Sequence, residues 1–244
     1  MSAPTAALTL DELSLAQGGR MVLEGVSGEF PVGSVTALVG ANGAGKSTLL
    51  AGIMGVLAPI AGTVHCAVPK ERRAWLPQQL ALDLSFPMSV EELVMTGCWP
   101  SHGALRGYSR AHYRRGREIM ERLGISELAH RPLGELSGGQ RQRALIGRTL
   151  MQQAELLVLD EPFANVDSAS VEVLTEVFRE MAAQGATLVV VLHDMQQLAQ
   201  LADRVLVLAE GRGEWFAPEE IIPAHDIHQR CLQTAQRLLS GARP

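Results

Sequence analysis

The sequence lacks any apolar run close to the roughly 20 residues that a helix needs to cross a bilayer. Its longest apolar stretches, Leu156–Leu159 and Leu188–Leu192, are short and rich in valine and leucine. Such stretches are typical of buried parallel strands. The first residues, Met1–Ala7, show no basic region followed by an apolar core, so we expect neither a signal peptide nor a membrane-spanning helix.

Cysteine and positive charge are also scarce. The three cysteines, Cys66, Cys98 and Cys231, are far apart and odd in number. They fit unpaired thiols in a reducing cytosol better than a disulfide framework. The formal net charge of -5 argues against binding nucleic acid through bulk charge. Hydrophobic residues make up 47% and charged residues 19%, which is the balance of an α/β domain with a substantial core.

Strand and helix patterns alternate along the chain. Leu8–Leu15 and Met21–Phe30 alternate apolar and polar side chains, as half-buried antiparallel strands do. The apolar strand Val35–Val39 is followed by a glycine-rich turn and the helical segment Lys46–Met54. Further on, the helical stretch Ser170–Gln184 separates two more predicted strands, Glu155–Asp160 and Thr187–Leu192. This order predicts a parallel sheet with crossover helices.

We interpret the chain as a single domain, because it contains no linker rich in Pro, Gly or Ser and no internal repeat. Ser89–Gln153 has an almost entirely helical pattern, which suggests a helical insert in an α/β core. The predicted parts of the domain 1–244 are an α/β core of about residues 1–85 and 154–217, a helical subdomain of about residues 86–153 and a short helical tail, 218–244.

The clearest chemical signal is a glycine-rich loop between the strand Val35–Val39 and the helix that begins at Lys46. Glycines let the backbone curl around phosphate oxygens, and the N-terminus of the following helix adds a positive dipole end. Lys46 supplies a charge for the β- and γ-phosphates, and the Ser47 hydroxyl is placed to ligate Mg²⁺. The predicted nucleotide-binding residues of this phosphate loop are Gly40, Asn42, Gly43, Gly45, Lys46, Ser47 and Thr48.

Two carboxylates stand at the end of the strand Glu155–Asp160. A parallel strand that ends in acids delivers them to the carboxyl edge of the sheet, where ligands of open α/β folds bind. A pair of acids alone is often only a solvated turn, but here it accompanies a phosphate loop. Asp160 is therefore predicted to hold Mg²⁺, and Glu161 to orient and deprotonate the attacking water.

A third motif, Leu136-Ser-Gly-Gly-Gln140, opens a predicted helix that runs through Met151. Its serine is of a type that caps helix N-termini. At this string the sequence resembles the ABC ATPase family, because the string matches the signature of that family. The order of the motifs also matches, with Lys46, Ser137, Asp160 and His193 following one another within about residues 8–217.

The resemblance implies a P-loop NTPase core with a parallel sheet, an N-terminal antiparallel β subdomain and a helical signature subdomain. It also implies ATP and Mg²⁺ as cofactors. In this family two copies close head to tail, so that each ATP lies between the phosphate loop of one copy and the signature of the other. Ser137, Gly139 and Gln140 would then contact the partner's nucleotide. Because this chain has one copy of each motif, it is expected to work with a second copy of itself.

Three further positions correspond to family motifs. Gln78 resembles the glutamine that senses Mg²⁺ and the lytic water, although the neighbouring Gln79 stays open for this role. His193, at the end of a predicted strand, resembles the switch histidine that holds the γ-phosphate. Asp167 matches the loop that couples the two active sites across the dimer. The resemblance thus implies Glu161, His193 and Gln78 as the catalytic set and Ser47, Gln78 and Asp160 as the Mg²⁺ set.

One position departs from the family pattern. Members usually carry an aromatic residue that stacks on adenine just before the glycine pair at the second strand. Here the segment is Leu15-Ala-Gln17-Gly-Gly19, which has no aromatic residue. Base stacking is therefore expected to be weaker or to come from another part of the protein. The preference for ATP over GTP rests on the resemblance alone.

The segment Leu84–Gly97, which follows the glutamine motif, favours a transporter motor. In transporters of the family, such a segment lines the groove that receives a short helix of the membrane subunit. The chain lacks the long coiled coil of the repair proteins and the second cassette of the ribosome-associated ones. We therefore expect a peripheral subunit on the cytoplasmic face of the inner membrane. Its expected partners are membrane permease subunits and, at one remove, an extracytoplasmic substrate-binding protein, without nucleic acid.

The segments Phe86–Val90 and Asp160–Asp167 resemble most closely those of the importers of zinc and manganese. Importers of haem, iron-siderophore or cobalamin stay open as alternatives, because the cassette never touches the cargo. The alternative from another class is a soluble ABC ATPase that remodels nucleic acid or a protein complex. A regulator that binds nucleotide without turnover is disfavoured, because Glu161 and His193 are both present.

Two other clusters have both a functional and a purely structural interpretation. Arginines gather around Tyr108 and Tyr113, where they could meet an acidic partner, lipid headgroups or nucleic acid, but a solvated helix face is the favoured interpretation. These arginines are Arg106, Arg110, Arg114, Arg115 and Arg117. His225, His228 and Cys231 are spaced by three, would share one face of a helix and could bind a transition metal, although coincidence is favoured.

Overall fold

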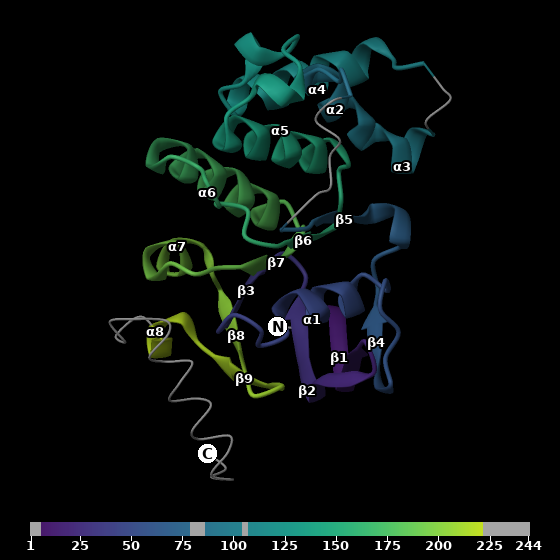
Figure 1. Ribbon diagram of the computed structural model, residues 1–244, viewed down its shortest axis with the longest axis vertical. Coiled ribbons are helices and arrows are strands. Elements are labelled where there is room, and N and C mark those ends of the chain that lie inside the picture. The colour runs from purple at the N-terminus through teal and green to yellow at the C-terminus, as the bar shows by residue number, and fades with distance from the viewer. Residues whose placement is uncertain (1–5, 79–85, 104–106, 222–244) are drawn as a thin grey trace.

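The computed structural model describes residues 6–78, 86–103 and 107–221. Its centre is a sheet with the strand order β5-β6-β7-β3-β8-β9 (Figure 1). The strands from β5 to β8 in that order pair in parallel, and β9 turns back antiparallel to β8. The predicted parallel sheet is thus confirmed. Its strands are β3 (Val35–Gly40), β5 (Arg73–Leu76), β6 (Leu156–Leu159), β7 (Thr187–Val191), β8 (Arg204–Ala209) and β9 (Arg212–Phe216).

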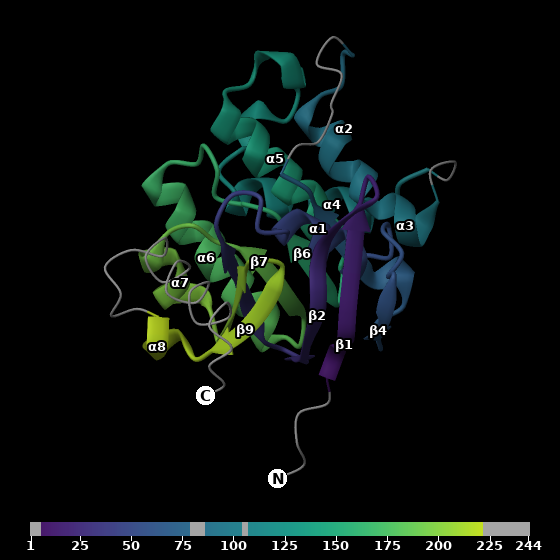
Figure 2. The same ribbon diagram turned by 60° about the horizontal axis from the view of Figure 1, so that its bottom comes forward.

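A second, antiparallel sheet has the order β2-β1-β4, and Figure 2 shows β1 and β2 side by side. Its strands are β1 (Ala6–Gln17), β2 (Arg20–Pro31) and β4 (Ala61–Cys66). The buried leucines of β1 change from even to odd positions between Leu10 and Leu13, because the register shifts there and Glu12 adopts a left-handed φ of 45°. The bulge keeps these leucines on the buried side of the sheet. The predicted antiparallel strands are confirmed.

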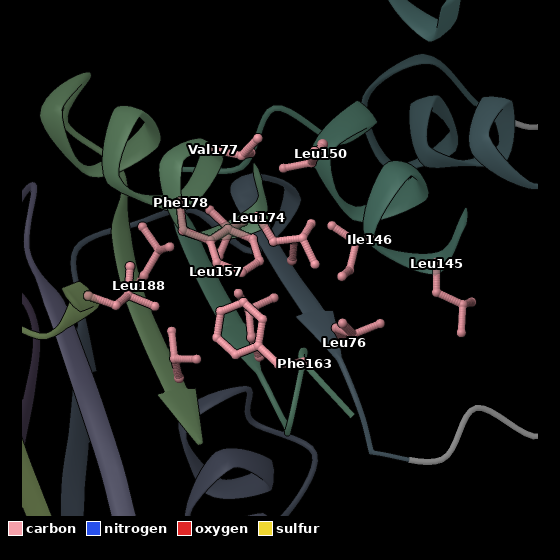
Figure 3. Packing of buried hydrophobic residues seen from close by; sticks show 14 of the residues in the cluster. Leu76, Leu145, Ile146, Leu150, Leu157, Phe163, Leu174, Val177, Phe178 and Leu188 are labelled. Carbon is pink, nitrogen blue, oxygen red and sulfur yellow. The ribbon is translucent and has the colours of Figure 1, made fainter. Parts of the chain in front are cut away.

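Each face of the central sheet has its own hydrophobic core. Helix α1 (Lys46–Ile53) and strands β1 and β2 pack against one face, where Leu38 and Val158 are fully buried. The other face is covered by three helices, α5 (Gly138–Met151), α6 (Ser168–Ala183) and α7 (Met195–Leu201). Figure 3 shows Leu157 and Leu188 of the sheet against Leu174 and Phe178 of α6. These two layers of apolar contact fix the strand ends that carry the site.

In the described part of the segment between β5 and β6, every element is a helix or a 3-10 turn, in agreement with the predicted helical pattern. A capping box begins each of its three main helices, with Ser89, Ser109 and Ser137 as the N-cap residues. In Figure 1, α2, α4 and α5 lie together in the upper part and α1 in the lower part. The other elements of this segment are α2 (Val90–Met95), α3 (Trp99–His102), α4 (Arg110–Arg122) and three 3-10 turns, Thr96–Cys98, Ser126–Leu128 and Leu133–Glu135.

The remaining elements are a 3-10 turn at Lys70–Arg72 and the short helix α8 (Pro218–Ile221), with which the described chain ends. Within the described ranges, no helix is long and apolar enough to cross a membrane. The division into a core of about 1–85 and 154–217, a helical subdomain and a tail stays a proposal. The rest of the predicted tail lies outside the described residues.

Candidate functional site

The predicted catalytic residues meet at the carboxyl edge of the central sheet. The strands β5, β6, β7 and β3 are consecutive neighbours and all run parallel. Gln78 follows β5, Asp160 and Glu161 follow β6, His193 follows β7, and the glycine loop follows β3. Because parallel strands end at one edge, residues far apart in sequence come together there.

The glycine loop joins buried β3 to α1. Gly45 is the N-cap residue of α1 and adopts a left-handed φ of 98°, which a residue with a Cβ rarely does. A Cβ there would also lie 2.7 Å from Cδ2 of Leu23. Lys46 is buried, and its Nζ donates to the carbonyls of Gly40 at 2.8 Å and Ala41 at 3.0 Å. The lysine charge is thus held inside the curl of the loop.

Ser47 and Asp160 join this loop to the end of β6. The Ser47 hydroxyl donates to Oδ2 of Asp160 at 2.8 Å. The other oxygen, Oδ1, is buried and has no hydrogen-bond partner among the described residues. Burial raises the pKa of the Asp160 carboxyl above its ordinary value, against the hydrogen bond from Ser47, which lowers it.

These groups fit a magnesium ion. A hard divalent cation prefers carboxylate and hydroxyl oxygens, and an unpartnered buried carboxylate oxygen is costly without one. Oδ1 of Asp160 is such an oxygen, and the Ser47 hydroxyl lies beside the same carboxylate. Gln78 is exposed just beyond β5, at the same sheet edge, with an amide oxygen as a further donor. Gln79, left open for the same role, lies outside the described residues.

Glu161 and His193 are already in contact. His193 Nε2 lies 2.7 Å from Glu161 Oε1, so that the imidazole donates to the carboxylate when Nε2 carries the proton. Glu161 adopts a left-handed φ of 53°, which is unusual for this residue type. Strained residues of this kind persist only where the surroundings hold them. A carboxylate and an imidazole in this pair are able to take a proton from water and to stabilise a neighbouring phosphate oxygen.

The signature residues lie at the start of α5, where Ser137 is the N-cap residue. Ser137 Oγ accepts from the Gln140 N–H at 3.2 Å, and Gln140 Oε1 accepts from the Ser137 N–H at 3.0 Å. Gly139 packs against Asn165 of the loop that leads into α6. Asp167 ends that loop as the N-cap residue of α6, and hydrogen bonds from Ser170 hold the pKa of its carboxyl below the ordinary value.

A cleft of about 510 Å³ borders the glycine loop. Asn42, Gly43 and the half-exposed Met21 are among the residues that line it. Sequence reasoning did not single out Met21, because its place in an amphipathic strand explains an apolar residue without any ligand. Thr48, the last predicted residue of the loop, donates to Gln17 Oε1 at 3.4 Å, so that the residue in the usual aromatic position contacts the nucleotide loop.

The two clusters outside the motifs contribute no described ligand site. Arg110, Arg114 and Arg117 are exposed on α4, and Arg114 lies 4.0 Å from Glu118. The favoured solvated face agrees with these three positions but is wrong for Arg115, which is half-buried and whose Nη2 donates to the Leu150 carbonyl at 3.5 Å. Arg106, His225, His228 and Cys231 lie outside the described residues. Among residues that are described, no group of three or more His, Cys, Asp and Glu side chains is arranged to hold a metal ion.

A family model described as ABC transporter matches residues 23–164, from β2 through the loop after β6. This range contains the glycine loop, the signature and both carboxylates. The chain belongs to the ABC transporter family. It is therefore an ABC-type ATPase with a P-loop NTPase fold, as the sequence predicted.

Relatives of this ABC ATPase include ATP-binding proteins of import and transport systems. The zinc transport system ATP-binding protein TroB of Treponema pallidum is 40% identical over 85% of this chain and 80% of its own. The manganese transport system ATP-binding protein MntB of Listeria innocua is 34% identical over 82% and 86%. The hemin import ATP-binding protein HmuV of Streptomyces coelicolor is 42% identical over 80% and 72%.

Solved structures agree with the fold. The ADP conformation of MJ1267, an ATP-binding cassette of an ABC transporter, superposes with a TM-score of 0.74 at 27% identity, over 90% of this chain and 94% of that one. The ATP-binding subunit of another ABC transporter reaches a TM-score of 0.81 at 22% identity, over 95% and 100%. At 22% identity, the similarity to this second structure shows the fold alone.

Proposed function

We propose that this ABC ATPase energises the uptake of a transition metal ion, zinc or manganese, through separate membrane subunits. The observation that carries the proposal is the meeting of Ser47, Asp160, Glu161 and His193 at one sheet edge in a chain that is 40% identical to a zinc transport ATPase. A regulator that only binds nucleotide would need neither Glu161 nor His193. The similarity to TroB and MntB supports zinc or manganese as the cargo.

Hydrolysis would take place between two copies of the chain. Ser137 and Gly138 are exposed at the N-terminus of α5. In Figure 1, α5 lies in the upper part and α1, which follows the phosphate loop in the sequence, lies in the lower part. A helix N-terminus attracts phosphate, so an exposed one is suited to the nucleotide of another copy. The head-to-tail arrangement supplies each site with Lys46 from one copy and Ser137 from the other.

Within each site, the residues divide the work. Lys46 and the loop N–H groups bind the phosphates, and Ser47, Asp160 and Gln78 would hold Mg²⁺. When bound there, the ion would supply positive charge for the phosphate oxygens. Glu161 orients a water molecule and accepts its proton. His193 contacts that carboxylate through Nε2, and its other ring nitrogen would donate to the γ-phosphate when both nitrogens carry protons.

The membrane subunits are proposed to dock on the α2–α3 side. Phe86 is 59% exposed and Trp99 is 42% exposed, and both flank α2. Trp99 Nε1 donates to Tyr108 Oη at 2.8 Å, and the rings of Tyr108 and Tyr113 are 5.9 Å apart. Exposed aromatic groups of this kind are typical interface anchors. The subunit would then sit on the cytoplasmic face of the inner membrane, with an extracytoplasmic protein delivering the cargo.

Import of haem is the second candidate, because HmuV is 42% identical to this chain. The cassette itself does not distinguish the cargoes, since the cargo contacts the membrane subunits. A remodelling ATPase is less well supported, because the relatives named above belong to import and transport systems.

The test is uptake of labelled zinc, manganese and haem by cells that lack this chain, with wild type or Glu161→Gln restored. We expect wild type to restore uptake of zinc or manganese and Glu161→Gln to restore none. The matched control is Glu155→Gln, the same change in a residue that pairs with Arg72 at 2.7 Å and lies at the opposite end of β6. If the wild-type chain restores only haem uptake, haem replaces the metal ion as the proposed cargo. If uptake of none of the three cargoes depends on the chain, the import role is rejected.

A further inference from the structure

The loop between Glu161 and α6 is held in a strained shape. Glu161 and Asn165 both adopt left-handed φ angles, 53° and 60°. A left-handed φ is unfavourable for a residue with a Cβ, more so for Glu161 than for Asn165, unless neighbouring groups fix it. The backbone hydrogen bonds described within the loop join residues three positions apart, from Ala164 N to Glu161 O at 3.1 Å and from Val166 N to Phe163 O at 3.2 Å. Further contacts must therefore stabilise this shape.

The signature helix of the same chain supplies those contacts. Gln142 Nε2 donates to the Pro162 carbonyl at 3.1 Å, next to Glu161. Gly139 approaches Asn165 so closely that a Cβ would lie 2.6 Å from the Asn165 carbonyl oxygen. The first two turns of α5 thus lie along the loop that begins with the predicted catalytic base.

The third contact reaches the far end of the loop. Arg143 Nη1 donates to Ser170 Oγ at 2.7 Å, and Ser170 Oγ donates to Asp167 Oδ2 at 2.8 Å. The Ser170 N–H also donates to Asp167 Oδ1 at 3.0 Å. Ser170 is buried, so its hydroxyl has no ready substitute partner in water. The hydroxyl accepts from the guanidinium, which can only donate, and donates to the Asp167 carboxylate, which can only accept, so Ser170 links Arg143 to Asp167.

We infer that Arg143 is a positioning residue that makes the signature helix and the Glu161–Asp167 loop move as one body. The inference rests on the proposed head-to-tail dimer. There, α5 binds the nucleotide of one site, while Glu161 of the same chain serves the other site. A shift of α5 on phosphate contact is transmitted through Arg143, Ser170 and Asp167 to that loop. Occupancy of one site then sets the geometry of the other.

The experiment compares Arg143→Gln with wild type in steady-state ATP hydrolysis by the full chain with Mg²⁺. We expect kcat to fall about 10-fold, KM for ATP to stay within about 2-fold, and the Hill slope to fall from about 2 toward 1. Arg143→Lys keeps the positive charge and N–H donors on a side chain of similar length, whereas Gln is shorter and neutral, so Arg143→Lys should recover part of kcat. Ser170→Ala should reproduce the Arg143→Gln effect, and the double variant should be no worse than either single variant.

The matched control is Arg122→Gln. Arg122 Nη2 pairs with Glu180 Oε1 at 2.6 Å, so it also joins the helical segment to α6, but away from the loop. If Arg122→Gln lowers kcat and the Hill slope as much as Arg143→Gln does, Arg143 acts only by joining helices. Unchanged kcat and Hill slope in Arg143→Gln would likewise overturn the inference.

A second measurement tests the role of Arg143 independently of the proposed dimer. Amide hydrogen exchange in the nucleotide-free monomer reports the loop directly, and Arg143→Gln should speed exchange across 162–170 while Arg122→Gln does not. A wild type with a Hill slope of 1 would count against the dimer, and the exchange result would still decide the role of Arg143. Equal exchange in wild type and Arg143→Gln overturns it.

Discussion

Ser47 Oγ donates a hydrogen bond to Asp160 Oδ2 over 2.8 Å, although 113 positions separate the two residues. The bond joins the N-terminus of α1 to the end of β6 and leaves Oδ1 of Asp160 buried without a partner in the described part of the chain. The carboxylate is therefore shaped for a cation and is unfavourable in its absence. Such a site destabilises the protein without its ligand and stabilises it with the ligand, which is a common conflict between function and stability.

Replacement of Asp160 by Asn should stabilise the nucleotide-free protein and abolish hydrolysis. Burial raises the pKa of Asp160 above its ordinary value, so the folded state holds this proton more tightly than the unfolded state. The free energy of unfolding therefore falls as the pH rises from the ordinary pKa through the raised one, and the cost is complete above it. Asp160→Asn removes the charge, and each 1 kcal/mol recovered raises Tm by about 2–4 °C.

Thermal unfolding of wild type and Asp160→Asn between acid and neutral pH checks this expectation. The Tm difference should be largest at neutral pH and should vanish once the wild-type carboxyl is protonated in both states. Addition of Mg²⁺ and ATP should raise Tm of the wild type more than that of the variant. A lower Tm of the variant at neutral pH would show that the Ser47 bond outweighs the burial of charge.

The sequence predicted site residues best where they follow the end of a strand. Lys46, Asp160 and His193 each stand just beyond an apolar strand, and the rule that parallel strands share one carboxyl edge brings them together. Strand β4 was not predicted, because its side chains are exposed or half-buried and give no alternating apolar pattern. Contacts between α5 and the Glu161 loop were also beyond prediction, since they depend on how two elements pack rather than on any local pattern.

Glu161→Gln should lower kcat strongly and leave ATP binding intact. The amide keeps the size of the carboxylate and can still accept from His193, but it cannot take a proton from water. Loss of a general base costs about 10²–10⁴-fold in rate. His193→Ala should cost about 10²–10³-fold, and the two losses should not add, because both act on one contact. Single-turnover hydrolysis and binding of a fluorescent ATP analogue measure the two quantities separately.

Glu155→Gln is the control for this prediction, because it makes the same chemical change at the other end of β6. Glu155 pairs with Arg72 on the surface, so its loss should leave kcat within about 2-fold and cost under about 1 kcal/mol of stability. Fully additive losses in the double variant Glu161→Gln, His193→Ala would argue that the observed 2.7 Å pair has no part in hydrolysis.

Gly139→Ala should destabilise the protein, whereas Gly138→Ala should not. A Cβ at position 139 would lie 2.6 Å from the Asn165 carbonyl oxygen, but one at position 138 would lie 3.5 Å from the Asn165 Cβ, an ordinary contact. Both positions are helical, where alanine is favoured over glycine by up to about 1 kcal/mol. Overpacking at 139 should outweigh this gain and cost about 1–3 kcal/mol.

Urea unfolding of the nucleotide-free chain measures both glycine variants without any contribution from catalysis. Hydrogen exchange should also show faster opening of the loop around Asn165 in Gly139→Ala, because the loop must shift to admit the methyl group. Equal unfolding free energies for the two variants would mean that the loop yields at no cost, and its left-handed residues would then be held by other contacts.

Gln17→Tyr should tighten nucleotide binding. Gln17 is exposed at the end of β1, so a larger side chain meets no steric barrier, and its 3.4 Å contact with Thr48 places it beside the nucleotide loop. An aromatic ring stacks on a base for about 1–3 kcal/mol, with little dependence on the base. ATP and GTP should therefore both bind at least about 5-fold more tightly, while Gln17→Leu, which adds apolar area without a ring, gains less. Titration with both nucleotides decides the matter: an unchanged Kd in Gln17→Tyr would place the base elsewhere, with the cleft beside Met21 as the next position to test.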